Sequence, residues 1–244
     1  MIAAFFDIDG TIYRESLIKE VFKKMVKYEI ITEETWQHEV RPLYLKWDAR
    51  QGDYDTYLLK MVEVYTETVK SISPTHIKYI AKKIIEQRGD RVYTFSRDRI
   101  SWHKKQGHKV IAISGSPIEL VKEMSDKYEM DDYKGAVYLS NGNTYTGEVI
   151  PMWDSKSKSK AIAEMVDKYD INLSNSYAYG DTTGDFSMLQ QVGNPYAVNP
   201  TRELLNKVTM DDEMRNKITV IIQRKDVIYK LSTDELHYTE NSQN

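Results

Sequence analysis

The sequence predicts an α/β fold: a Rossmann-like, doubly wound parallel sheet core with an inserted all-helical cap domain. Two observations support this prediction. Apolar runs that suit buried strands alternate with segments of helical periodicity over residues 1–15 and 90–200. Between the first and second of these runs, residues from about 15 to 90 show helical periodicity and no strand signal.

Four short runs are the predicted strands of the sheet, and each ends at polar residues or at a glycine. They cover residues 2–6, 110–113, 176–179 and 196–198. Both faces of the first run are apolar, which is typical of a parallel strand covered by helices on both sides. Residues 135–150 resemble two further short strands around an Asn-Gly-Asn turn at 141–143.

Helical patterns account for most of the remaining chain. In the core they cover residues 118–124 and 162–169, and in the insertion they cover about 17–29, 33–50, 58–69 and 77–84. Ser73 and Pro74 mark a helix start, because serine caps a helix and proline is tolerated in its first turn. Pro42 should kink or interrupt its helix. The polar residues 233–244 should be frayed.

The insertion is rich in large aromatic side chains, which we interpret as packing between its helices. A pocket for an apolar leaving group is the alternative. The residues are Trp36, Tyr44, Trp47, Tyr54, Tyr57 and Tyr65.

Composition narrows the class of protein. The 244 residues suffice for a core and one smaller domain, and a net charge of −3 gives no basic footprint for nucleic acid or anionic membrane. The absence of cysteine excludes disulfides and thiolate chemistry. The first apolar run is too short for a signal peptide, and no stretch reaches membrane-spanning length, so we expect a cytoplasmic protein. The five histidines are scattered and receive no role. Oligomeric state is not predicted.

Polar residues gather where the predicted strands end. Asp7 and Asp9 follow the first strand, Ser114 the second, and Asp181 and Asp185 the third. In an open α/β sheet, ligands bind at the carboxyl ends of the strands. We therefore expect these side chains to meet in one crevice.

The first motif reads Asp7-Ile8-Asp9-Gly10-Thr11. A carboxylate can attack phosphorus, and a second one two residues away can protonate the leaving oxygen and then activate water. Gly10 allows a tight turn that brings N–H groups toward an anion. Because carboxylates repel a phosphate dianion, a cation is needed, and Mg²⁺ suits oxygen ligands.

Three further motifs fit phosphate chemistry. Ser114 and Gly115 lie between a strand and a helix, where hydroxyl and N–H donors can face a phosphate. A lysine within residues 155–160, just before a helix, would hold the nucleophile and the phosphoryl oxygens together. In the last motif, Asp181 would bind the metal and Asp185 would support it.

In this order the motifs resemble those of the haloacid dehalogenase (HAD) superfamily: DxDGT, a strand-ending Ser or Thr, a Lys, then GDxxxD. The helical insertion resembles the C1 cap of subfamily IB, which includes phosphoserine phosphatases. The resemblance implies a core of residues 1–15 plus 90–244 and a cap of residues 16–89.

The resemblance also implies roles for individual residues. It makes Asp7 the nucleophile and Asp9 the general acid/base. It assigns Mg²⁺ to Asp7, the backbone carbonyl of Asp9, and Asp181. It implies that the phosphoryl group is bound by the lysine and by the motif residues Gly10, Thr11, Ser114 and Gly115.

Two lysines compete for the phosphate-binding role. Family members carry apolar residues three, four, seven and eight positions after this lysine. From Lys158 these positions are all apolar, whereas from Lys160 most are charged. We therefore select Lys158, with Lys160 as the alternative.

The predicted function is Mg²⁺-dependent hydrolysis of a small phosphorylated metabolite through an aspartyl-phosphate. A phosphotransferase or mutase using the same site is the first alternative, and a non-catalytic phosphate-binding module the second. Phosphoserine phosphatases typically carry a glutamate nine residues after the nucleophile, to pair with the substrate ammonium. Here that position is Ser16, with Glu15 before it, so phosphoserine is not favoured as the substrate.

Overall fold

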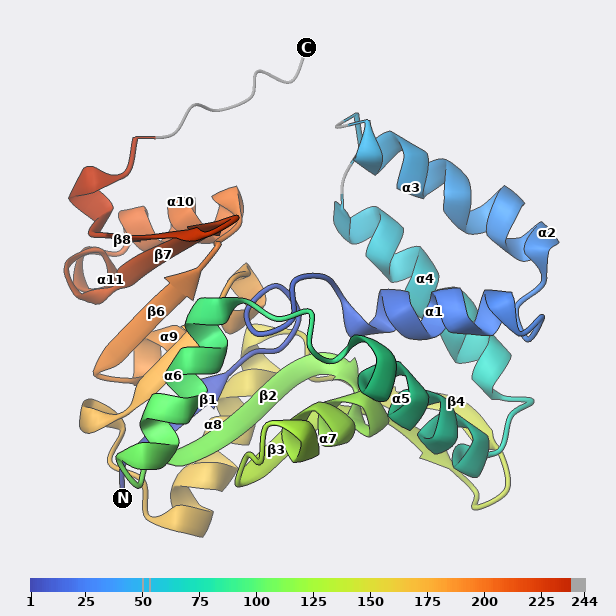
Figure 1. The fold of residues 1–244 in the computed structure, drawn as a ribbon, viewed down its shortest axis with the longest axis horizontal. Helices are drawn as coiled ribbons and strands as arrows, with labels where there is room; N and C mark the ends of the chain where they lie inside the picture. The colour runs from blue at the N-terminus through green and yellow to red at the C-terminus, as the bar shows by residue number, and fades with distance from the viewer. Residues whose placement is uncertain (50, 53, 238–244) are drawn as a thin grey trace.

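A computed structural model describes residues 1–49, 51–52 and 54–237 of the chain. Its centre is one sheet of eight strands in the order β4-β3-β2-β1-β5-β6-β7-β8 (Figure 1). The six strands from β3 to β7 in this order pair in parallel, and β4 and β8 add antiparallel edges. The strands are β1 Ala3–Phe6, β2 Lys109–Pro117, β3 Asp132–Ser140, β4 Tyr145–Ile150, β5 Tyr177–Gly180, β6 Asn194–Val198, β7 Thr219–Arg224 and β8 Val227–Leu231.

Helices cover both faces of this sheet, which confirms the predicted doubly wound α/β fold. In β1, Ala3 and Phe5 pack against α8, α9, α10 and α11, whereas Ala4 and Phe6 point to the cluster that contains α6 and α7. These helices are α6 Thr94–Lys105, α7 Ile118–Lys127, α8 Ser155–Tyr169, α9 Phe186–Gln191, α10 Arg202–Met210 and α11 Asp212–Lys217. Three single 3₁₀ turns lie at Leu173–Asn175, Thr183–Asp185 and Thr233–Glu235.

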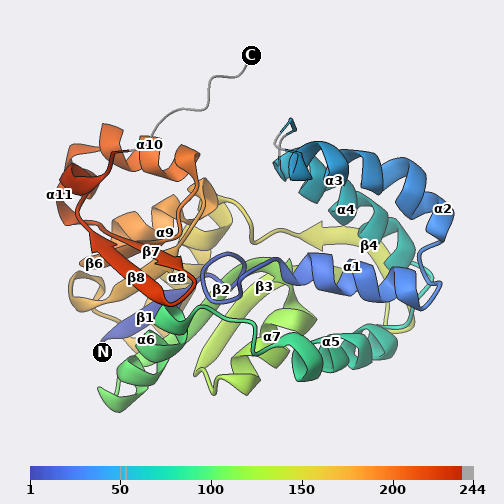
Figure 2. The ribbon, with the colours of Figure 1, turned by 45° about the horizontal axis from the view of Figure 1, so that its top comes forward.

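The stretch between β1 and β2 is helical, as predicted. The segments from α1 to α4 stand to one side of the sheet in both views, and α5 packs against α7 (Figures 1 and 2). An isolated backbone bridge between Tyr13 and Val92 brings the two linkers of the insertion together. The elements are α1 Leu17–Lys27, α2 Glu33–Thr35, a π-helix Trp36–Val40, α3 Arg41–Asp48, α4 Tyr54–Val69 and α5 Pro74–Arg88.

Both proline predictions in the insertion are confirmed. Pro42 lies in the first turn of α3, directly after the π-helix that interrupts the helical stretch. Pro74 opens α5, and the hydroxyl of Ser73 accepts a hydrogen bond from the N–H of His76. The helix is therefore irregular at the point where proline, which has no backbone N–H, cannot donate a hydrogen bond to the preceding helical turn.

The aromatic residues of the insertion pack between its helices. Tyr57 and Tyr65 are buried, and the rings of Tyr57 and Trp47 stack with centroids 5.9 Å apart. Trp36 and Tyr44 are partly buried against the same apolar cluster. These positions confirm the packing interpretation, while the side chain of Tyr54 lies outside the described residues.

The C-terminal part departs from the sequence prediction. Residues 233–235 form a turn closed by a capping box rather than a frayed end, and 238–244 lie outside the described residues. Among the described residues, no helix combines the length and apolar character needed to cross a lipid bilayer.

Candidate active site

The loop after β1 is a tight turn that presents two aspartates. Its geometry comes from one carbonyl, that of Ile8, which accepts hydrogen bonds from the N–H groups of Thr11, Ile12 and Tyr13. Gly10 has a φ of +77°, a conformation that suits glycine. A Cβ at Gly10 would lie 2.0 Å from Oδ2 of Asp181, so the turn also needs glycine for space.

Lys158 is the lysine that reaches Asp7. Its ammonium lies 2.6 Å from Oδ1 of Asp7 and also pairs with Oδ1 of Asp185. Its side chain is 4% exposed, whereas Lys156 and Lys160 point to solvent. We expected this lysine before its helix, but α8 begins at Ser155 and Lys158 lies in the first turn. The reason is Asp154, whose carboxylate caps the helix by accepting a hydrogen bond from the N–H of Ser157.

Asp185 connects the lysine to the loop after β5. Its Oδ2 accepts hydrogen bonds from the N–H groups of Asp181 and Thr182, each 3.0 Å long. Its other oxygen pairs with Lys158. Because Asp185 is fully buried, these donors fix its orientation and, through it, the lysine.

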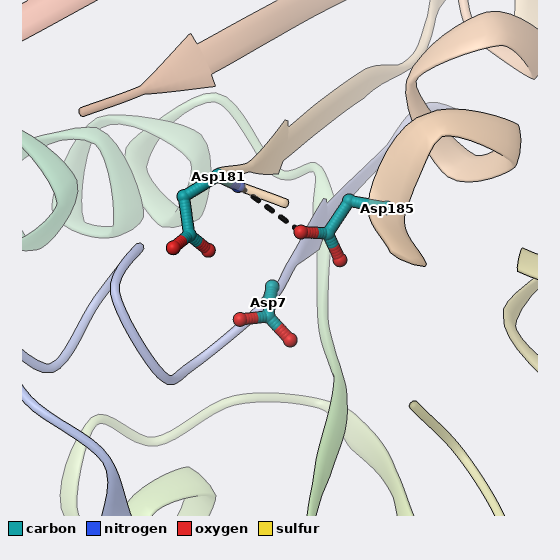
Figure 3. A group of neighbouring side chains, drawn as sticks. All are labelled: Asp7, Asp181 and Asp185. Atoms are coloured by element: carbon teal, nitrogen blue, oxygen red, sulfur yellow. Dashed lines mark hydrogen bonds between the residues drawn. The ribbon is translucent and has the colours of Figure 1, made fainter. Parts of the chain in front are cut away.

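Three carboxylates converge at this point. Oxygens of Asp7, Asp181 and Asp185 all lie within 4.8 Å of one another, and Figure 3 shows the side chains of the three residues close together. Thr11 donates a 3.0 Å hydrogen bond to Oδ1 of Asp181. The structure thus brings together Asp7, Asp181 and Asp185, which are remote in sequence, and places Thr11 beside them.

Asp9 points to a different set of partners. Oδ2 accepts a 2.5 Å hydrogen bond from the hydroxyl of Ser116, and Oδ1 accepts a 2.8 Å bond from the N–H of Leu17. Burial raises the pKa of Asp9 to about 6, although both hydrogen bonds oppose the shift. A carboxyl with such a pKa can carry a proton in one step and release it in the next at neutral pH.

The second motif lies at the end of β2. Ser114 is fully buried, and its hydroxyl oxygen accepts a 3.2 Å hydrogen bond from the N–H of Ser116. Gly115 is packed against Trp153, because a Cβ there would lie 2.9 Å from the Cβ of Trp153. Both residues therefore lie on the strand that also supplies Ser116 to Asp9.

The charges at the site fit a divalent cation. Burial raises the pKa of Asp7 and of Asp181 above its ordinary value, and neighbouring carboxylates add to both shifts. Burial disfavours the ammonium of Lys158, but Asp185 and Asp7 outweigh this effect and hold its pKa above the usual range. One ammonium thus faces several buried carboxylates, and oxygen ligands of this kind suit Mg²⁺.

Comparison with known proteins identifies the family. The chain matches the family of haloacid dehalogenase-like hydrolases over residues 4–190, and it belongs to this family. It is 26% identical over 205 residues to the inhibition of morphological differentiation protein of Streptomyces azureus, which covers 83% of this chain and 73% of that protein. It is 29% identical over 119 residues to a probable phosphatase of Mycobacterium tuberculosis, covering 49% of this chain and 42% of that protein. The chain thus spans less than half of that second relative.

A solved structure shows the same fold. It is a phospho-aspartyl intermediate analogue of phosphoserine phosphatase, with a TM-score of 0.57, 19% identity, and coverage of 92% of this chain and 94% of that one.

Sequence reasoning missed one residue of this site. Ser116 was noted within its motif but received no role, although its hydroxyl binds Asp9. The only local signal was its position two residues after Ser114, since alternate residues of a strand share a face.

Proposed function

We propose that this protein is a Mg²⁺-dependent phosphatase that hydrolyses a small phosphate monoester through an aspartyl-phosphate on Asp7. The observation that carries the proposal is the buried contact between Lys158 and Asp7, beside Asp181 and Asp185. The lysine ammonium favours the charged form of Asp7 against the opposing effect of burial, and it gives the phosphoryl oxygens a positive partner.

In the first step, a carboxylate oxygen of Asp7 attacks phosphorus in line with the ester oxygen. The bond between phosphorus and this oxygen breaks, and the leaving oxygen takes the proton of Asp9. The products of this step are an alcohol, an aspartyl-phosphate and the carboxylate of Asp9. Lys158 and the donors around Ser114 would stabilise the charge on the phosphoryl oxygens.

In the second step, Asp9 takes a proton from a water molecule whose oxygen attacks the same phosphorus. The bond between phosphorus and Asp7 breaks, which releases inorganic phosphate and restores the carboxylate of Asp7. Asp9 ends protonated, ready for the next turnover. The two steps thus use one residue first as acid and then as base.

Asp7, Asp181 and the backbone carbonyl of Asp9 would hold Mg²⁺, with Asp185 orienting Lys158 and the loop. When bound, the ion supplies positive charge that lets an anionic nucleophile and an anionic phosphate approach each other.

We propose that residues 16–89 act as a cap over a core formed by 1–15 and 90–244. The substrate would be a small phosphorylated metabolite. A substrate ammonium finds no ready partner in the linker, because Ser16 stands nine residues after Asp7 and Glu15 is paired with Arg91 and Lys19, at 3.1 Å each. This pairing speaks against phosphoserine as the preferred substrate.

The test measures phosphate release from p-nitrophenyl phosphate and from a panel of phosphorylated metabolites, with Mg²⁺ and with EDTA. We expect release only with the metal, and loss of release in Asp7→Asn. Asp126→Asn, which changes an exposed carboxylate paired with Lys122, is the matched control and should remain active. Full activity of Asp7→Asn, or activity in EDTA, would contradict the proposal.

A further inference from the structure

Both carboxylate oxygens of Asp9 have a donor, and the two donors come from different parts of the molecule. Ser116, at the end of β2 in the core, donates its hydroxyl proton to Oδ2 over 2.5 Å. Leu17, the first residue of α1 in the insertion, donates its N–H to Oδ1 over 2.8 Å. The two bonds together fix the plane of the carboxylate.

The local structure of β2 aims Ser116 at Asp9. The pairing of β2 with β3 shifts register between Ile113 and Pro117, so the segment that contains Ser114 and Ser116 departs from the regular ladder. Such irregularities re-aim side chains near functional sites. Ser116 is 2% exposed, and its N–H is bonded to the hydroxyl oxygen of Ser114. Its side chain is therefore held in place on the strand.

The start of α1 explains the second donor. Ser16 stands at the N-cap, and the first N–H of the helix, that of Leu17, has no carbonyl partner within the helix, so Asp9 provides its acceptor. Asp9 thus joins the insertion to the core. The bond from Leu17 depends on the position of the insertion, whereas the bond from Ser116 lies wholly within the core.

We propose that Ser116 is a positioning residue that holds the carboxyl group of Asp9 in line with the leaving oxygen. This inference rests on the proposed function, since it concerns the acid/base of that reaction. Ser116 touches neither phosphorus nor the leaving oxygen in this role. It uses one lone-pair site of Oδ2, and the remaining sites of the carboxyl group stay open for the proton that moves to the leaving oxygen.

The role has a specific kinetic signature. p-Nitrophenolate leaves readily without a proton, whereas an alkoxide leaves only when the acid protonates it. Asp9 also serves as the base in the second step, which is the same for every substrate, so the bias belongs to the first step, which kcat/KM reports. Misplacing the acid should therefore lower kcat/KM for alkyl phosphates far more than for p-nitrophenyl phosphate. A general loss of structure would slow both substrates alike.

The first experiment compares Ser116→Ala with the wild-type protein on p-nitrophenyl phosphate and on glycerol 3-phosphate, or whichever alkyl phosphate the wild-type protein hydrolyses best. We expect kcat/KM for the alkyl substrate to fall roughly 10- to 100-fold, the range for one hydrogen bond to a charged group. kcat/KM for the aryl substrate should fall by less than about threefold. Ser125→Ala is the matched control, since Ser125 is fully buried and its hydroxyl has no partner among the described residues.

The second experiment introduces Ser116→Ala into an Asp9→Asn background. If Ser116 acts through Asp9, Ser116→Ala should lower kcat/KM for the alkyl substrate very little once the acid has been removed. Ser116→Cys has a similar volume and only a weak donor, so it should show the same substrate bias and serves if Ser116→Ala fails to fold.

The inference is overturned if the serine variants lower kcat/KM of both substrates equally, or if they lower neither. It is also overturned if Ser116→Ala lowers kcat/KM for the alkyl substrate as much in the Asp9→Asn background as alone. If the wild-type protein releases phosphate from no substrate, the proposed function itself fails. These outcomes are distinguishable.

Discussion

The ammonium of Lys158 lies 2.6 Å from Oδ1 of Asp7, although the two residues are 151 positions apart in the sequence. Asp185, in the loop after the neighbouring strand β5, pairs with the same ammonium and also accepts hydrogen bonds from two N–H groups of its own loop. The loop after β5 therefore holds Asp185, and Asp185 holds the ammonium of Lys158 in place. This places one positive charge at the carboxylate that we propose as the nucleophile.

Removing this ammonium should disable the site. We expect Lys158→Met to lower kcat by roughly 100- to 1,000-fold, the usual effect of losing one preorganised charge partner. Steady-state kinetics with p-nitrophenyl phosphate measures the effect. Lys160→Met is the matched control, because Lys160 lies two residues further along α8 and is exposed. Comparable losses in both variants would mean that Lys158 has no special role.

Metal binding should stabilise the fold through Asp181. Mg²⁺ at about a hundred times its Kd would add roughly 2.7 kcal/mol to the free energy of unfolding. For a chain of this size that corresponds to a rise in Tm of about 5–10 °C. Asp181→Asn should lose most of the rise at the same Mg²⁺ concentration, and EDTA should abolish it in the wild-type protein. Thermal unfolding measures both effects, and an unchanged rise in Asp181→Asn would place the ion elsewhere.

Gly10 offers a test of the geometry of the turn. Gly10→Ala should abolish activity, because the new Cβ would lie 2.0 Å from Oδ2 of Asp181. Gly107→Ala is a close control: its φ is +74°, against +77° at Gly10, but nothing lies within 4 Å of its Cβ position. Both variants should lose about 1–2 kcal/mol of stability from the backbone conformation, and only Gly10→Ala should lose activity. Phosphate release and urea unfolding separate the two effects.

Lys158 rather than Lys160 lies beside Asp7 for a physical reason that the sequence pattern carries. Helix α8 turns Ala161, Ile162 and Met165 into the apolar cluster under the sheet, and Lys158 lies on the same face of the helix. The helical period therefore carries the lysine to the sheet edge where Asp7 ends β1. Strand ends were predictable in the same way, because buried parallel strands are marked by apolar runs.

Other features left at most a weak local signal in the sequence. Helix α6 has a sequence rich in charged and polar residues, with Ile100 as its one fully apolar buried position, so its periodicity is weak. The contact between Ser116 and Asp9 spans 107 positions and depends on the register shift in β2. Such a contact follows from tertiary packing and cannot be read from residue spacing.

A buried histidine network should make stability depend on pH. His103, on α6, is fully buried; its Nε2 lies 2.8 Å from the hydroxyl of Tyr179, and its Nδ1 lies 2.9 Å from Nδ1 of His108. Burial, with smaller contributions from the charge of Arg99 and from His108, lowers the pKa of His103 to about 3. The folded protein therefore keeps this ring neutral.

The sign of the effect follows from proton binding. An unfolded histidine has a pKa of about 6.5, so between about pH 6.5 and 3 the unfolded chain binds a proton at this ring that the folded chain does not, and acidification removes stability. Between pH 7.5 and pH 5, the His103 contribution is a loss of about 2 kcal/mol.

The raised pKa values of Asp7 and Asp181 act in the opposite direction, because their carboxyls take up protons in the folded state. Urea unfolding at both pH values gives the change in the free energy of unfolding between them, and comparing wild type with His103→Gln isolates the histidine. The contribution of His103 to this change should vanish in the variant. His76→Gln, at an exposed ring on α5, is the control and should keep the wild-type change. An identical pH difference in all three proteins would contradict this prediction. It would mean that the ring of His103 takes up a proton in the folded protein and faces His108 and Tyr179 as an imidazolium.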